Sequence, residues 1–165
     1  MRNIYLVGFM GSGKSTIGKL LAQESGMKFV DIDKEVEKSQ CMSIKEMFEN
    51  LGEEYFRKAE KDKLMEYIKR SGFVVSTGGG LGADKGMMEL MKNSGTVIWI
   101  KVSIHTILSR CKNDQDRPLL KLPEDKLLEL FEKRKEVYSL ANISVTSDDK
   151  TPFQVLQEIL QKINR

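Results

Sequence analysis

Cysteine and histidine are scarce in this sequence of 165 residues, which has two Cys and one His. Cys41 and Cys111 cannot form a disulfide framework, and they are too few for a four-ligand zinc site. His105 alone cannot supply a His-rich metal centre, and a Ser-His-Asp triad would depend on it entirely. We interpret His105 as a polar residue at the start of a helix and the two cysteines as free thiols of a reducing cytosol.

Long apolar runs and a strong excess of one charge are also missing. No window approaches the roughly 18 apolar residues of a membrane span, and no apolar stretch of signal-peptide length follows Met1. The net charge is only +3, from 27 basic and 24 acidic residues. Lys alternates with Asp and Glu, as in 57–69, which is more typical of a solvated helix face than of a nucleic-acid-binding surface. We therefore expect a cytoplasmic protein that binds small anions, with neither nucleic acid nor membrane as a partner.

Short apolar runs alternate with helical patterns along the chain, of which 40% is hydrophobic. The runs are rich in β-branched and aromatic residues and cover 3–7, 28–31, 72–76, 96–102 and 143–146. Capping boxes at Ser43 and Thr151 mark two helix starts. This alternation predicts an α/β fold with a parallel sheet covered on both faces. No repeat, low-complexity tract or linker divides the chain, so we expect one domain over 1–165.

A phosphate-binding motif follows the first predicted strand. The run Gly8-Phe9-Met10-Gly11-Ser12-Gly13-Lys14-Ser15-Thr16 fits G-x4-G-K-[ST] and opens a helical pattern. Glycines let backbone N–H groups turn towards phosphate oxygens, and the helix N-terminus adds positive potential. We expect Lys14 to reach the β- and γ-phosphates, Ser15 to bind Mg²⁺ and Thr16 to bind the α-phosphate. ATP is the expected donor, because the guanine motif Asn-Lys-x-Asp is missing.

Two carboxylates, Asp31 and Asp33, end the second predicted strand. Strand alternation would place them on the same side. One could then hold magnesium through water, while the other faces an acceptor hydroxyl as base or orienting group. The alternative is that Asp33 is the N-cap of a helix starting at Lys34.

The acceptor site is expected at the carboxyl ends of the strands, where open α/β sheets bind ligands. The third predicted strand leads into Gly78-Gly79-Gly80, which would expose backbone N–H groups to a ligand, or else form only a flexible turn. Arginine, which binds carboxylates and phosphates through two parallel bonds, is much rarer than lysine here. Away from the termini its positions are Arg57, Arg70, Arg110, Arg117 and Arg134.

The segment 113–124 interrupts the alternation of strands and helices. Pro118 and Pro123 prevent a continuous helix through it. Connections of this length in compact domains are often functional. We predict a lid that closes over bound substrates, the alternative being a long surface loop.

Seven motifs occur in one order over most of the chain. They are Gly8-Phe9-Met10-Gly11 through Thr16, Asp31-x-Asp33, Ser43-Ile44-x-Glu46-x-Phe48, Gly52-Glu53-x-x-Phe56-Arg57-x-x-Glu60, Gly78-Gly79-Gly80, Arg117-Pro118-Leu119-Leu120 and Arg134-x-x-x-Tyr138. This combination closely resembles the shikimate kinase family. The resemblance implies a P-loop kinase fold like that of nucleoside monophosphate kinases. Such a fold has a five-stranded parallel sheet of order 2-3-1-4-5 flanked by helices, with a mobile lid. It also implies transfer of the ATP γ-phosphate to the 3-hydroxyl of shikimate.

The resemblance further implies roles for individual residues. Lys14, Asp33 and Arg117 would be catalytic, with Arg117 supplied by the lid, and Ser15 and Asp31 would hold magnesium. ATP would contact Gly11, Ser12, Gly13, Lys14, Ser15, Thr16, Arg110 and Arg117, with Arg110 near adenine. Shikimate would bind largely in the region 34–60 and contact Asp33, Phe48, Phe56, Arg57, Gly79, Gly80 and Arg134. The carboxylate of shikimate would be surrounded by Arg57, Gly79, Gly80 and Arg134.

The family pattern is not followed everywhere. Ala141 stands three residues after Tyr138, where the family usually has Ala four places on, so the register of the adenine loop at 146–152 stays open. A gluconate or nucleoside monophosphate kinase of the same fold is an alternative, which Phe56-Arg57 and the triple glycine disfavour. A nucleotide-binding module without catalysis is another, although Lys14 and Asp33 are both present. We expect a monomer.

Overall fold

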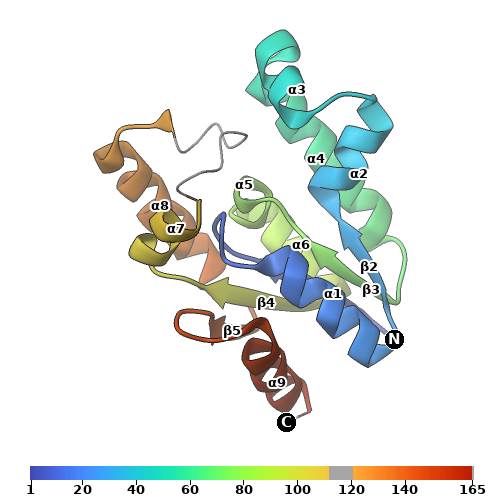
Figure 1. Cartoon of the computed structure of the whole chain (residues 1–165). Helices are drawn as coiled ribbons and strands as arrows, with labels where there is room; N and C mark the ends of the chain where they lie inside the picture. Colours follow the sequence, from blue (N-terminus) through green and yellow to red (C-terminus); the bar gives the residue numbers. More distant parts are fainter. Residues whose placement is uncertain (112–120, 165) are drawn as a thin grey trace.

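The centre of the molecule is a parallel β-sheet (Figure 1). The computed structural model describes residues 1–111 and 121–164. The strands are β1 (Asn3–Val7), β2 (Lys28–Asp31), β3 (Phe73–Ser76), β4 (Gly95–Lys101) and β5 (Ile143–Thr146). They form a five-stranded sheet in the order β2-β3-β1-β4-β5, with every neighbouring pair parallel. The predicted order is confirmed, and the carboxyl ends of all strands therefore lie at one edge.

The strand bounds differ slightly from the predicted ones at two places. β3 begins at Phe73 and not at Gly72, because Gly72 turns the chain with a φ of 83°. β4 begins at Gly95, one residue earlier than predicted, because Gly95 pairs with Asn3 at the start of β1. It ends at Lys101, so Val102 lies outside the strand.

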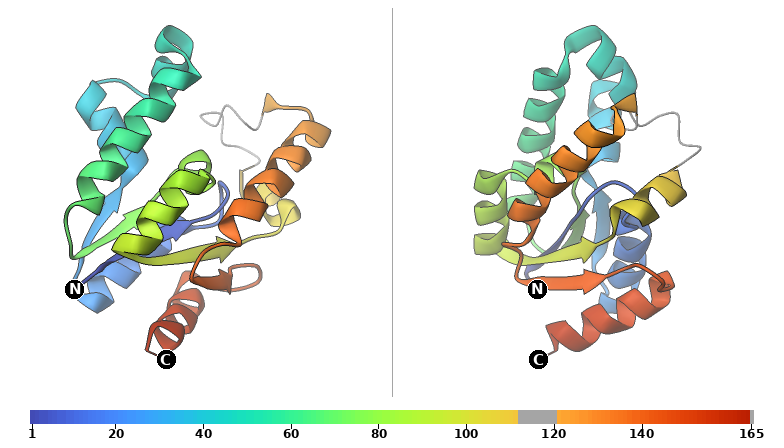
Figure 2. Two further views of the ribbon diagram at one scale, coloured as in Figure 1. Left: turned by 180° about the vertical axis from the view of Figure 1, so that it is seen from behind. Right: turned by 90° about the vertical axis from the view of Figure 1, so that its left-hand side faces the viewer.

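Helices cover both faces of the sheet (Figure 2). Ile4 and Leu6 of β1 belong to the core cluster shared with α1 (Lys14–Ser25) and α9 (Pro152–Ile163). The alternate residues Tyr5 and Val7 belong to the opposite cluster, which α4 (Glu53–Ile68), α6 (Lys85–Ser94) and α8 (Glu124–Tyr138) complete. Burial on both faces explains why the strands have continuous apolar runs and not an alternating pattern.

Two helices and the N-terminal turns of α4 lie beyond the carboxyl edge of the sheet (Figure 1). The two helices are α2 (Ile32–Gln40) and α3 (Ile44–Leu51). The predicted capping box at Ser43 begins α3, and the one at Thr151 begins α9. Gly52 alone separates α3 from α4, with a φ of 85° that L side chains rarely adopt. This glycine lets the chain reverse without a loop and brings the two helices into contact.

The remaining helices are α5 (Gly79–Gly82) and α7 (Ile104–Cys111). His105 lies exposed in the first turn of α7, as predicted. Most of the predicted lid, including Arg117, lies outside the described residues. Its last residue, Glu124, already belongs to α8, which begins after Pro123. Among the described residues, no helix is long and apolar enough to cross a membrane.

Candidate active site

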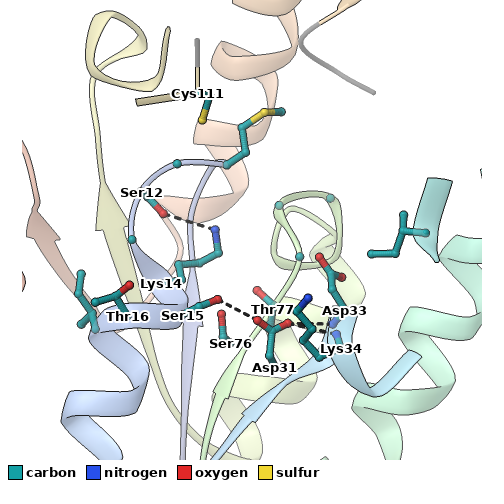
Figure 3. Close-up of a pocket in the computed structure, with 18 of the residues that line it drawn as sticks. Ser12, Lys14, Ser15, Thr16, Asp31, Asp33, Lys34, Ser76, Thr77 and Cys111 are labelled. Carbon is teal, nitrogen blue, oxygen red and sulfur yellow. Dashed lines mark hydrogen bonds between the residues drawn. The ribbon is translucent and has the colours of Figure 1, made fainter. Parts of the chain in front are cut away.

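A cavity of 870 Å³ opens at the carboxyl edge of the sheet (Figure 3). It is lined by every predicted site residue that the structure describes. These are Gly11, Ser12, Gly13, Lys14, Ser15, Thr16, Asp31, Asp33, Phe48, Phe56, Arg57, Gly79, Gly80, Arg110 and Arg134. Arg117 is the one predicted site residue outside the described part of the chain. The volume of the cavity is typical of cavities that bind small molecules.

The loop between β1 and α1 has the geometry of a phosphate cradle. Gly11 and Gly13 adopt φ values of 72° and 90°, which turn the backbone around the end of β1. The first residues of α1 line the cavity, so the positive end of this helix faces it. No side chain caps this N-terminus. The Lys14 ammonium donates to the carbonyl oxygens of Gly8 at 2.7 Å and Phe9 at 3.0 Å. The loop thus presents backbone dipoles and one cation to a bound anion.

Ser15 and Asp31 face each other across the base of this loop (Figure 3). The Ser15 hydroxyl donates to Asp31 Oδ2 at 2.8 Å. A hydroxyl and a carboxylate side by side are oxygen ligands of the kind that Mg²⁺ prefers, with water and phosphate oxygens completing its shell. The donor set therefore fits magnesium.

Asp33 does not occupy the predicted position. β2 ends at Asp31, whose side chain accepts from the backbone N–H of Asp33 at 3.1 Å and caps α2. Both parts of the expectation were wrong: the two carboxylates are not on one strand, and the N-cap is Asp31 and not Asp33. Because the chain turns into a helix, Asp33 lies in the first turn of α2 with its carboxylate at the cavity. Burial, together with the charge of Asp31, raises the pKa of Asp33.

The triple glycine leaves room for charged side chains of the protein itself. It forms the start of the short helix α5, and not a flexible turn. A Cβ added at Gly78 would lie 2.5 Å from Glu60 Oε1 and 2.9 Å from Asp33 Oδ1. A Cβ at Gly79 would lie 2.9 Å from Arg134 Nη1, and one at Gly80 would lie 2.6 Å from Arg57 Nη1. Glycine is therefore needed here for space as well as for backbone access to a ligand.

Glu60 is a site residue to which the sequence assigned no role. It is 1% exposed, and its Oε2 accepts from Arg57 Nη1 at 2.8 Å. Burial, with the nearby Asp33, raises the pKa of Glu60 to about 7 against the opposing effect of Arg57. A signal was present, because Glu60 falls four residues after Phe56 and four before Leu64, within the buried stripe of α4.

The two predicted acceptor arginines differ in their surroundings. Arg57 has carboxylate partners in Glu60 and, at 3.4 Å, Glu53. Arg134 is 9% exposed, and its guanidinium lies over the Phe9 ring, 5.5 Å from the centroid. Burial lowers the pKa of Arg134. Within the described residues, Arg134 forms no ion pair, so one buried guanidinium at the cavity lacks an anionic partner.

Aromatic side chains border the cavity on the side of α3 and α4. The rings of Phe48 and Phe56 pack with their centroids 5.2 Å apart, and both line the cavity. The Arg57 guanidinium lies 5.3 Å from the centroid of the Phe56 ring. This wall would shield one face of a small cyclic ligand from water.

The loop after β5 closes the other end of the cavity. Thr146 pairs with Lys101, and Ser147 follows with its N–H donating to the Lys101 carbonyl oxygen at 2.9 Å. Arg110 donates to the carbonyl oxygens of Gly11 at 3.0 Å and Ser147 at 3.2 Å. Ser147 and Pro152 line the cavity. The register of the loop at 146–152 is thereby defined, and Arg110 ties it to the phosphate-binding loop.

Comparison with known proteins agrees with this geometry. The sequence model described as "SKI: Shikimate kinase" matches residues 10–164. A shikimate kinase of Sulfurihydrogenibium sp. (strain YO3AOP1) is 58% identical, over 100% of this chain and 99% of the relative. The chain belongs to the shikimate kinase family. The resemblance inferred from the seven motifs is thus confirmed.

Solved structures of shikimate kinases have the same fold as this chain. The crystal structure from Aquifex aeolicus has a TM-score of 0.91 at 44% identity, covering 98% of this chain and 96% of the other. A structure from Acinetobacter baumannii, in complex with shikimate, has a TM-score of 0.94 at 36% identity and covers 99% and 93%. The chain is therefore a kinase of the P-loop fold, with ATP as co-substrate and Mg²⁺ as its metal ion.

Proposed function

We infer that the chain transfers the γ-phosphoryl group of ATP to the 3-hydroxyl of shikimate. The product is shikimate 3-phosphate, and the reaction belongs to aromatic amino acid biosynthesis. Arg134 carries the assignment of the acceptor site, because its buried guanidinium lacks an anionic partner among the described residues. A buried charge of this kind is costly unless it is paired. A carboxylate on the acceptor would supply the partner.

We assign the nucleotide to the end of the cavity at the phosphate-binding loop. The N-terminus of α1 and Lys14 bind the β- and γ-phosphates, and Ser15 and Asp31 hold Mg²⁺, which neutralises charge on the phosphates. Arg110 and Pro152 border the adenine end. Phosphoryl transfer needs mainly positioning and neutralisation of charge, which these groups supply.

We assign shikimate to the other end, within one domain spanning 1–165. The region 34–60 supplies the aromatic wall and Arg57, and Gly79, Gly80 and Arg134 complete the carboxylate site. Asp33 faces the acceptor hydroxyl. The roles of Arg117 and of a lid at 113–124 remain predictions from the sequence motifs.

Location and partners are proposed on chemical grounds. Cys41 and Cys111 are both free thiols, which suits the reducing cytoplasm. Basic and acidic residues are nearly balanced, which favours neither nucleic acid nor anionic membranes as partners. We propose a cytoplasmic monomer that binds only its two substrates and magnesium.

The acceptor can be tested by turnover of the purified protein. With ATP and Mg²⁺ present, ADP should form rapidly on addition of shikimate but not of gluconate or AMP. A coupled assay of ADP release gives kcat and KM for each acceptor. Equal turnover with gluconate would contradict the assignment, and turnover with none of the three would favour a nucleotide-binding module without catalysis.

Lysine substitution separates charge from geometry at the acceptor arginines. Arg57→Lys and Arg134→Lys keep the charge but cannot form the two parallel bonds of a guanidinium to a carboxylate. We expect the Kd of shikimate to rise about tenfold to a hundredfold for Arg134→Lys, and less for Arg57→Lys because Arg57 already has carboxylate partners. Calorimetric titration should show an unchanged Kd for ATP. If both ligands were weakened alike, the two arginines would be structural.

A further inference from the structure

Tyr138 lies behind the acceptor end of the cavity and has no part in the chemistry described so far. It is the last residue of α8 and is 2% exposed. Its ring packs against Trp99, with centroids 6.0 Å apart. Its hydroxyl donates a hydrogen bond to the carbonyl oxygen of Gly79, the first residue of α5. Tyr138 therefore links the end of α8 to the triple glycine.

Gly79 is held between Tyr138 and Arg134. Arg134 precedes Tyr138 by one helical turn, so both side chains leave the same face of α8. A Cβ at Gly79 would lie 2.9 Å from Arg134 Nη1 and 3.5 Å from the Tyr138 hydroxyl oxygen. The guanidinium and the phenol thus both lie close to Gly79.

The phenol is well suited to a fixed role of this kind. Burial raises the pKa of Tyr138 above its usual range, against the opposing effect of Arg134, so the hydroxyl keeps its proton and remains a donor. The Tyr138 side chain has only two rotatable bonds and packs on Trp99, so it loses little conformational entropy when it forms this hydrogen bond. The carbonyl of Gly79 is thereby fixed relative to α8.

We propose that Tyr138 is a positioning residue for the acceptor carboxylate. This inference rests on the proposed function. The hydrogen bond from Tyr138 to Gly79 sets the direction of α5 relative to Arg134. The backbone N–H groups of Gly79 and Gly80 and the Arg134 guanidinium then converge on one carboxylate. Tyr138 itself does not touch the acceptor.

Removal of the hydroxyl tests the proposal. Tyr138→Phe should raise the KM of shikimate about threefold to tenfold, the effect of one lost hydrogen bond. The kcat and the KM of ATP should change less than about twofold, because the phosphate-binding loop does not depend on Tyr138. Steady-state kinetics with each substrate varied in turn measures this split.

Tyr5→Phe is the matched control. Tyr5 is fully buried, and its hydroxyl bonds to Ser94 at 2.8 Å and Asn3 at 3.1 Å, away from the cavity. The Tyr5→Phe substitution should lower the melting temperature without changing the KM of shikimate or of ATP. If Tyr138→Phe behaved like this control, or raised both KM values alike, Tyr138 would be a structural residue and the proposal would be wrong.

The double variant separates this proposal from the function on which it rests. In an Arg134→Lys background, Tyr138→Phe should add little to the shikimate KM, because the carboxylate site is already impaired. Full additivity would contradict coupling between Tyr138 and Arg134. An unchanged shikimate KM in Arg134→Lys alone would instead refute the assigned acceptor site.

Discussion

Asp33→Asn is expected to lower kcat for shikimate about a hundredfold to ten-thousandfold, the usual contribution of a positioned general base. Asn has almost the same shape as Asp, but it cannot take a proton from the acceptor hydroxyl. Asp33 is suited to this task because it lies half-buried at the cavity, and because desolvation of its carboxyl group and the charge of Asp31 raise its pKa. Single-turnover kinetics with saturating ATP and shikimate would measure the chemical step directly.

The size of the loss distinguishes two roles of Asp33. A fall of about tenfold or less would mean that the carboxylate only orients the hydroxyl, since a single hydrogen bond contributes about that much. Asp84→Asn is a suitable control, because Asp84 caps α6 and does not line the cavity. This control should leave kcat unchanged.

Lys14→Met should lower kcat by about two to three powers of ten, comparable to the loss of one preorganised group that stabilises transition-state charge. Met is close to Lys in length but carries no charge. Lys14 is 9% exposed, and its ammonium group donates to two backbone carbonyl oxygens at the end of the phosphate-binding loop. Its removal would leave the negative charge that develops between ATP and the acceptor without one of the side-chain cations at the cavity.

Binding measurements show whether Lys14→Met affects only the nucleotide site or also the binding of shikimate. The Kd of shikimate in the absence of ATP should stay within about twofold for Lys14→Met, because the acceptor arginines are intact. Lys34→Met provides a matched control, since Lys34 also lines the cavity but its side chain is 78% exposed. A near-normal kcat for Lys14→Met would mean that Lys14 is not needed to neutralise the charge of the phosphates.

Local patterns in the sequence predicted the sheet and the phosphate site. The apolar runs gave the five strands to within one residue at either end, because strands buried on both faces have continuous hydrophobic sequences. The phosphate-binding motif is a contiguous segment whose geometry depends on its own glycines. The strand order came from the family resemblance, because local patterns do not determine which strands are neighbours.

The acceptor site was harder to predict because it depends on packing. The predicted position of Asp33 was wrong, because Asp31 caps α2 and the chain is already helical from Ile32 onwards. The pairing of Glu60 with Arg57 depends on how deeply α4 is buried, which the spacing of its residues only suggests. The partners of the three glycines come from α2, α4 and α8, which no local pattern brings together.

The close packing of charged groups over the triple glycine limits how this pocket could be redesigned for another acceptor. Any side chain at Gly78, Gly79 or Gly80 would displace Asp33, Glu60, Arg57 or Arg134. Each change meant to reshape the pocket at these positions would disturb its charges as well. Phe48 also lines the cavity, and it is not among the side chains that a Cβ at these glycines would meet. Libraries that aim at a bulkier cyclic acid should therefore vary Phe48 and the neighbouring Ile44, and keep all three glycines.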